Sequence, residues 1–232
     1  MKLSSRLLSC AAMVRPGGVA ADVGTDHGYL AVYLVEQGIC PVVFASDIRE
    51  GPLSAARRSA AKAGITEQIR FCLSDGLREL PVSEIGTVIC AGMGGENIIH
   101  ILESEPDVFD PGKQLILQPQ SKTAELRRWL GENGFTVRQE RLSQDGKFIY
   151  TAMEAEYGNG GPISPVEQYM PEALLRSGDP LVPAYFSRVK QGVRLTVEGL
   201  RQAKTADPEQ LRFFEEVLAG LTKMEANYGL CK

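Results

Sequence analysis

The sequence predicts an α/β fold: a mostly parallel sheet covered by helices on both faces, followed by a helical extension. Over the first 134 residues, short and nearly continuous apolar runs alternate with amphipathic segments, as buried parallel strands joined by helices do. Two strand-like segments around a QDGK turn then indicate an antiparallel hairpin. Beyond residue 160 the apolar residues recur at helical spacing.

The elements follow in order from these patterns. An amphipathic helix is expected over residues 3–14, where the segment RPGG ends it. The strands are the short apolar runs at 19–23, 42–46, 69–73, 85–92 and 113–118. The intervening helices have Gly or Pro near their ends and are expected at 28–38, 51–64, 96–104 and 121–134. With the hairpin at 135–157, this is the layout of Rossmann-like methyltransferases, an analogy of fold that does not fix the function.

The composition changes at a Gly- and Pro-containing linker, residues 157–165. We therefore expect one domain over 1–160 and a second over 161–232. In the second, Asp207 before Pro208 is a typical helix start. The pattern predicts an antiparallel helical hairpin, with helices at 166–178, 183–205 and 208–228.

Composition limits the function classes. The chain has 232 residues, 44% of them hydrophobic, and a formal net charge of −4, so its bulk charge does not indicate a nucleic-acid binder. No apolar run reaches the roughly 18 residues of a membrane span, and Arg6 interrupts the apolar start that would otherwise resemble an export signal. Five cysteines without CxxC spacing indicate reduced thiols in a cytoplasmic protein. We expect a monomer with no metal site and no membrane contact.

The first strand leads into DVGTDHGYL, residues 22–30. This segment lacks the G-x-G-x-x-G of dinucleotide-binding turns, and Asp26 stands where the central glycine would be. A carboxylate there would repel a diphosphate, which disfavours an NAD oxidoreductase, but it would attract a ligand with an ammonium or sulfonium group. S-adenosylmethionine (SAM) carries both.

Acidic residues also follow the second and third strands. Asp47 can accept hydrogen bonds from two ribose hydroxyls, and Asp75 can accept one from an adenine amino group, with Gly76 allowing close backbone approach. Because ligands of parallel sheets bind at the carboxyl ends of the strands, this ordered set predicts a SAM site. The residues expected to bind SAM are Asp22, Gly24, Asp26, His27, Gly28, Asp47, Ile48, Asp75, Gly76, Ala91 and Gly92.

The fourth and fifth strands end in residues that suit a methyl acceptor. Met93, Gly94 and Gly95 offer an apolar surface and backbone approach, although small residues also serve ordinary strand-to-helix turns. Gln118 and Gln120 could read the edge of a base, or act as plain turn residues.

The strings DVGTDHGYL, SDI, SDGL, AGMGGENI and LQPQ, in this order, resemble the bacterial TrmK family of tRNA adenine-N1 methyltransferases, which act on position 22 in the D-loop region. The resemblance spans essentially the whole chain. It implies a SAM-dependent Rossmann-like domain and a coiled-coil-like helical extension that helps to hold tRNA. The sequence departs from the family at Gln120, where many relatives have Asn, so a base contact there is less secure.

The chemistry of adenine N1 needs no strong base, because N1 already carries a lone pair. Methylation leaves a cationic base, which a nearby carboxylate stabilises. Asp26 is the candidate for this role, with binding of the SAM ammonium as the alternative. N1 lies on the pairing edge, so the base must be flipped into the pocket.

The segment 187–204 has five basic residues against one acid, Glu198. They could contact RNA phosphates or pair with the acidic helix that follows; they are Arg188, Lys190, Arg194, Arg201 and Lys204. Two other functions stay open: a SAM methyltransferase acting on a small molecule or protein, and a catalytically silent RNA-binding module on the same fold.

Overall fold

The computed structural model describes residues 3–203 and 205–230. Its contacts divide the chain into two compact units, Met1–Gly161 and Pro162–Lys232, and each is described by itself. No helix within the described ranges is both long enough and apolar enough to cross a membrane.

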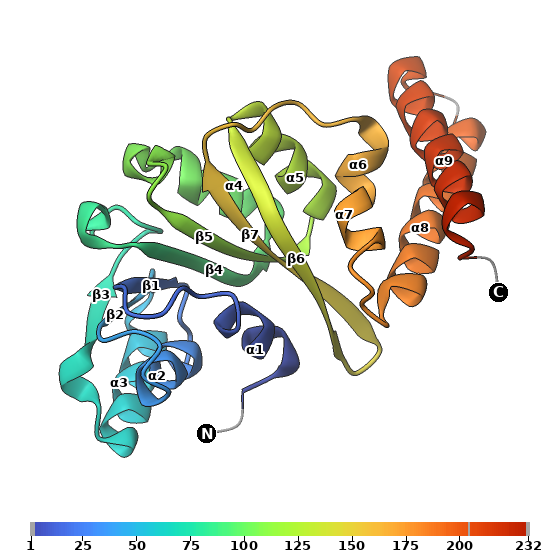
Figure 1. The fold of residues 1–232 in the computed structure, drawn as a ribbon. Coiled ribbons are helices and arrows are strands. Elements are labelled where there is room, and N and C mark those ends of the chain that lie inside the picture. The colour runs from blue at the N-terminus through green and yellow to red at the C-terminus, as the bar shows by residue number, and fades with distance from the viewer. Residues whose placement is uncertain (1–2, 204, 231–232) are drawn as a thin grey trace. The chain divides into compact units, whose positions relative to one another are not determined.

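The first unit is built on one sheet, shown in Figure 1. Its order is β3-β2-β1-β4-β5-β7-β6, with β1 to β5 parallel and β7 antiparallel to both β5 and β6. The strands are Ala20–Val23, Val43–Asp47, Ile69–Leu73, Thr87–Gly94, Gln114–Ser121, Phe135–Asp145 and Phe148–Tyr157. The predicted parallel sheet with a terminal hairpin is confirmed. The strand order reverses between β1 and β4, which is where open α/β sheets bind ligands.

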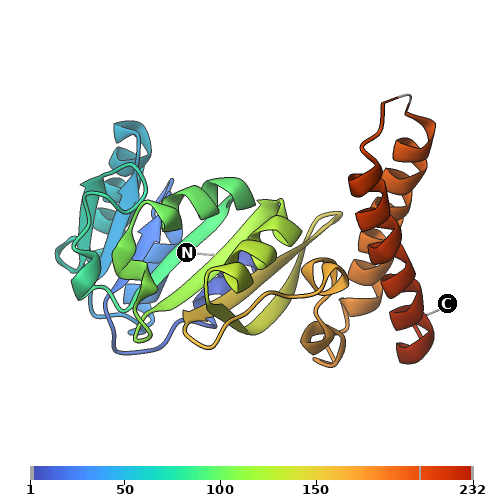
Figure 2. The same cartoon turned by 90° about the horizontal axis from the view of Figure 1, so that it is seen from above.

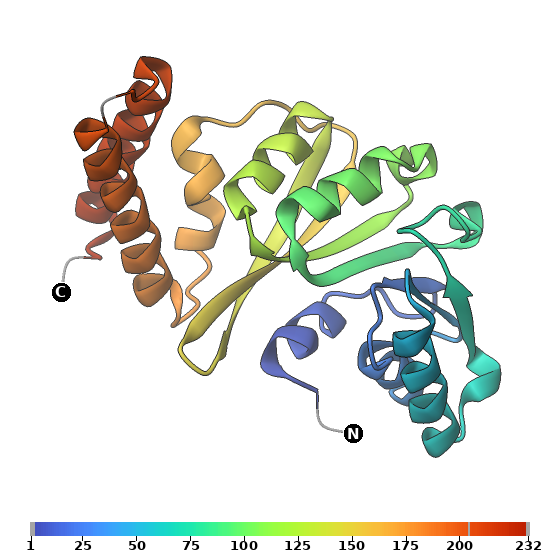
Figure 3. The same cartoon turned by 180° about the vertical axis from the view of Figure 1, so that it is seen from behind.

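Helices cover both faces of this sheet, as Figures 2 and 3 show. One face packs against α4 (Gly95–Glu103) and α5 (Thr123–Glu132), and the other against α1 (Ser5–Ala11), α2 (Tyr29–Glu36) and α3 (Glu50–Ala63). Short 3-10 turns complete the unit at Thr66–Gln68 (η1), Val82–Glu84 (η2) and Pro106–Phe109 (η3).

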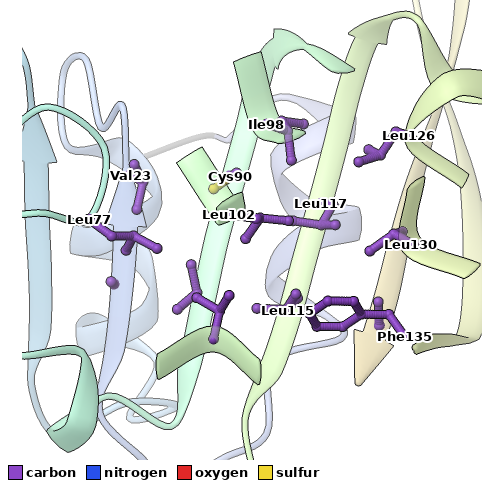
Figure 4. Packing of buried hydrophobic residues seen from close by; sticks show 14 of the residues in the cluster. Val23, Leu77, Cys90, Ile98, Leu102, Leu115, Leu117, Leu126, Leu130 and Phe135 are labelled. Atoms are coloured by element: carbon purple, nitrogen blue, oxygen red, sulfur yellow. The ribbon is translucent and has the colours of Figure 1, made fainter. Parts of the chain in front are cut away.

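Alternation along the strands decides which side chains face α1. Val23, Cys90 and Leu117 point toward Ile98 and Leu102 of α4 (Figure 4). Side chains one position away lie on the opposite face. The face covered by α1 therefore includes Asp22 of β1, Ala91 of β4 and Gln118 of β5. These side chains are brought together beside α1, where the site lies.

A buried ion pair ties α5 to the hairpin. Arg127 Nη2 lies 2.7 Å from Glu140 Oε2, and the two side chains are 2% and 4% exposed. Thr151 Oγ1 donates to the same Glu140 oxygen at 2.9 Å.

The second unit consists of α6 (Pro165–Tyr169), α7 (Glu172–Leu175), α8 (Val182–Gln202) and α9 (Pro208–Tyr228). The prediction of one helix over 166–178 is wrong. Met170 is extended, with φ −145° and ψ 96°, because the residue before a proline avoids the helical region. The helical hairpin is confirmed: α8 packs against α9, and Asp207 caps α9 by accepting from the Glu209 amide.

Candidate functional site

Two adjoining cavities lie where the parallel strands end. The first has a volume of about 590 Å³ and the second about 340 Å³, within the range of small-molecule sites. Arg6, Gly24, Asp26 and Ala91 line both cavities, so the two are continuous. The first extends toward Asp47 and Asp75, and the second toward Asp22 and His27.

Asp22 organises the loop after β1. Its carboxylate is buried, accepts a 2.6 Å hydrogen bond from Thr25 Oγ1 and is hydrogen-bonded to the backbone of Ala31. The N-cap of α2 is Gly28, which has no side chain to cap the helix, so Asp22 satisfies an amide of the first turn instead. Burial raises the pKa of Asp22 from 3.8 to about 6, and these hydrogen bonds limit the rise.

Asp26 projects from the same loop in a left-handed conformation, with φ 53°. Asp and Asn adopt this region more readily than other non-glycine residues, and such backbone outliers gather at functional sites. Its side chain is 71% exposed, and His27 Nε2 lies 3.7 Å from Asp26 Oδ2. The His27 ring stacks on Tyr29 at a centroid distance of 5.3 Å. His27 thus connects the Asp26 carboxylate to α2.

The first cavity contains the next two predicted carboxylates. Asp47 Oδ1 accepts from the Arg49 amide at 3.0 Å, and Asp75 Oδ2 lies 3.0 Å from Arg78 Nη1. Ile48 and Gly76 line this cavity beside them. Gly76 has φ +66°, and a Cβ on it would meet Ile101 Cγ1 at 3.1 Å.

The ends of β4 and β5 form the wall beside α1. Gly92 and Met93 line the first cavity, and a Cβ on Gly92 would meet Arg6 Nη1 at 2.8 Å and Gln120 Nε2 at 3.6 Å. Gln118 is buried and accepts a hydrogen bond from Arg6 Nη1 at 3.3 Å.

Three predicted glycines serve packing. Gly28 lines neither cavity, and a Cβ on it would meet Ala56 Cβ of α3 at 2.8 Å. Gly94 and Gly95 also lie outside both linings, and a Cβ on Gly95 would be 2.4 Å from the Lys122 carbonyl oxygen. Gly28 has φ +71°, and the element that approaches it closely is α3.

The predicted basic residues lie on α8 in the second unit. Lys190 Nζ pairs with Glu225 Oε2 at 2.6 Å, and Arg201 Nη2 with Glu215 Oε1 at 2.6 Å. Arg194 is exposed, bonds to Gln191 of its own helix at 2.7 Å, and its Nε lies 3.7 Å from Glu198 Oε1. Arg188 is exposed, and Lys204 lies outside the described residues.

Several lining residues were missed by sequence reasoning. Ser4 lines the second cavity, Arg6 lines both, and α4 contributes three side chains to the first: Asn97, His100 and Ile101. The α4 residues had a signal, because positions i, i+3 and i+4 share one helix face. Arg6 had none, since its partner Gln118 is 112 positions away.

Comparisons with known proteins agree with this geometry. The family model described as "Methyltransferase domain" matches residues 3–153. The tRNA (adenine(22)-N(1))-methyltransferase of Bacillus subtilis is 36% identical over 160 residues, which are 68% of this chain and 67% of that protein. Two Mycoplasma relatives with provisional names as tRNA methyltransferases are matched over only about 60% of their length.

Solved structures extend the likeness to nearly the whole chain. The crystal structure of the B. subtilis M1A22 tRNA methyltransferase TrmK is 29% identical, with a TM-score of 0.83 over 96% of this chain and 98% of that one. A Streptococcus pneumoniae protein solved in complex with S-adenosyl-L-methionine is 28% identical, with a TM-score of 0.79 over 94% of this chain and 100% of that one.

Proposed function

The chain belongs to the methyltransferase family of TrmK, the tRNA (adenine(22)-N1)-methyltransferases, and on that premise we propose that it methylates N1 of adenosine 22 in tRNA with SAM as the methyl donor. The observation that carries the proposal is the row of carboxylates along two continuous cavities at the strand ends. Because tRNA is found in the cytoplasm, we place the reaction there.

The residues of the cavities fit SAM. Asp75 at the far end suits the adenine amino group, and Asp47, with one oxygen already accepting from a backbone amide, suits the ribose hydroxyls. Gly24 and Ala91, at the junction of the cavities, leave room for the sulfonium. Asp22 and Asp26 supply negative charge for the ammonium group. When bound, SAM supplies an activated methyl group.

The chain's main task is to hold the acceptor base in line with that methyl group. Gly92 and Met93, which line the first cavity, are our candidates for the base-binding side. Gln118, which the sequence predicts to contact the base, is fully buried beside Arg6 and lines neither cavity. Met93 provides an apolar surface, and the Gln120 amide lies near Gly92, where a Cβ would be 3.6 Å from Gln120 Nε2. Asp26 lines both cavities, so its carboxylate can stabilise the positive charge that develops on the methylated base.

The helical hairpin is our candidate for contacts to RNA phosphates. On α8, Arg188 and Arg194 are exposed. Arg194 Nε lies 3.7 Å from Glu198 Oε1 of its own helix, and Lys190 and Arg201 pair with acids of α9. We assign the phosphate contacts first to Arg188 and Arg194, whose side chains are exposed on α8. Each phosphate neutralised on binding would make the affinity more dependent on salt.

The deciding experiment incubates the purified chain with methyl-labelled SAM and an unmodified tRNA transcript, and then maps the modified nucleoside. We expect 1-methyladenosine at position 22 and no label in a matched transcript with guanosine at that position. Label on another atom or position, or label only in a protein or small molecule, would contradict the proposal.

A further inference from the structure

Arg6 of α1 is a cation at the junction of the two cavities with no acidic partner among the described residues. Its guanidinium donates to the neutral Gln118 amide at 3.3 Å and lies against the backbone at Gly92. A neutral amide orients the guanidinium without neutralising it. The remaining donors of its planar fork suit a carboxylate or a phosphate.

The charged side chains that line the second cavity complement a zwitterionic ligand. Of its lining residues, Arg6 is the only lysine or arginine, and Asp22 and Asp26 are the acids. A ligand with both an ammonium and a carboxylate group satisfies both signs. A phosphate would meet Arg6 but would be repelled by the two aspartates, so the pattern favours an amino-acid end over a nucleotide phosphate.

A second polar group lies in the same cavity. The Ser4 hydroxyl, at the N-cap of α1, is buried and has no hydrogen-bond partner among the described residues. Ser4 lines the second cavity together with Arg6 and Leu7. Because buried hydroxyls are normally hydrogen-bonded, this one indicates a polar ligand group that completes its bonding.

We propose that Arg6, with the Ser4 hydroxyl beside it, binds the carboxylate at the methionine end of SAM. The N-terminal helix is thereby part of the cofactor site, and Gln118 is a positioning residue that aims the guanidinium. The inference rests on the proposed function for the identity of the cofactor. It does not depend on which substrate receives the methyl group.

The test compares two ligands that differ only in this carboxylate: S-adenosylhomocysteine and its decarboxylated analogue, S-adenosyl-3-thiopropylamine. Calorimetric titration of the wild-type chain should give tighter binding of S-adenosylhomocysteine. Arg6→Gln should weaken S-adenosylhomocysteine about 10- to 100-fold, as expected for a charge-assisted hydrogen bond. The decarboxylated analogue should bind the variant within about twofold of wild type, because it makes no such bond.

Two further variants keep the test decisive. Arg6→Lys keeps the positive charge but loses the planar guanidinium, so it should retain part of the preference for S-adenosylhomocysteine over the decarboxylated analogue. This variant provides the test if Arg6→Gln does not fold. Arg49→Gln is the matched control: Arg49 also lines the first cavity and is 76% exposed, and its loss should affect both ligands equally.

Three results would overturn the inference. Equal affinity of the wild-type chain for both ligands would mean that the carboxylate is not recognised. Equal losses for both ligands in Arg6→Gln would make Arg6 a structural residue of the wall. Unchanged S-adenosylhomocysteine binding with a raised KM for tRNA would assign Arg6 to an RNA phosphate. Failure of tRNA methylation would count against the proposed function and leave these binding results standing.

Discussion

The two units of the chain hold their positive charges differently. At the strand ends of the first unit, Arg6 faces a neutral amide. On the helical hairpin, Lys190 and Arg201 face the carboxylates of Glu225 and Glu215. A cation beside an amide keeps its charge for a ligand, whereas a cation paired with a carboxylate must first give up that partner. The excess of basic residues in 187–204 therefore overstates the charge that α8 offers to RNA.

The first unit also contains a charge pair that no ligand can reach, and its loss should give the largest effect. Glu140→Ala leaves Arg127 buried without its acid, so we expect the free energy of unfolding to fall by about 3–5 kcal/mol. Denaturant unfolding followed by the fluorescence of Trp129, the chain's one tryptophan, measures this in the first unit.

Glu215→Ala is the matched control, because it breaks the Arg201 pair at an exposed position. It should cost the second unit less than about 1 kcal/mol, measured by far-ultraviolet circular dichroism because Trp129 reports only on the first unit. Similar losses in the two variants would erase the distinction between the buried pair of the first unit and the surface pairs of the second.

A variant of Asp26 tests whether this exposed carboxylate at the strand ends acts in methyl transfer or only in SAM binding. Asp26→Asn keeps a residue type that tolerates φ 53° and removes the charge. We expect turnover on tRNA to fall about 100-fold and SAM affinity to fall by a much smaller factor. Single-turnover rates and calorimetric titration separate the two, and equal losses would assign Asp26 to the SAM ammonium alone.

Asp22 should make the stability of the first unit depend on pH. Its pKa is raised by burial from 3.8 to about 6, so between these pH values the folded protein binds more protons than the unfolded chain. The contribution of Asp22 to stability is therefore greatest below about pH 4 and is lost as pH rises through about 6, on the order of 1–3 kcal/mol in total.

The measurement is the difference in unfolding free energy between the wild type and Asp22→Asn at several pH values from about 4 to about 7. Other titrating groups are common to both proteins and cancel in this difference. A difference that does not change with pH would mean that burial does not shift this carboxyl.

The smallest effect is expected on the hairpin. Because Glu215 already neutralises Arg201, Arg201→Gln should lower tRNA affinity less than about threefold and change the salt slope by clearly less than the ~0.9 of a full phosphate contact. Glu215→Gln should raise affinity, because it releases the cation. Binding measured over a series of salt concentrations decides both, and a change of about one whole contact in Arg201→Gln would show that the pair opens for RNA.

The sequence predicted the sheet, the hairpin and the positions of the acidic residues well, for a local reason. Asp22 and Asp47 lie at or near the ends of β1 and β2, Asp75 comes two residues after β3, and parallel strands bring their carboxyl ends to one edge. What could not be predicted depends on distant contacts. Arg6 reaches the site because alternation turns Gln118 toward α1.

Gly28 shows a different limit of sequence reasoning. A glycine in a strand-to-helix loop gives the same signal whether a ligand or a neighbouring helix makes the close approach. Here Ala56 of α3 makes it, and no residue near Gly28 in sequence could have indicated that. The break between α6 and α7 was predictable from Pro171, since the rule for residues before proline is local.

The contact between Arg6 and Gln118 also limits how early the site can form while the chain is being synthesised. The two residues are separated by 112 positions, so the N-terminal helix leaves the ribosome long before β5 exists to receive it. β5 in turn pairs with β7, which is synthesised later still. Arg6 therefore gains the side chain that orients it only when the first unit is nearly complete, and a chain arrested before β5 lacks this contact at the junction of the two cavities.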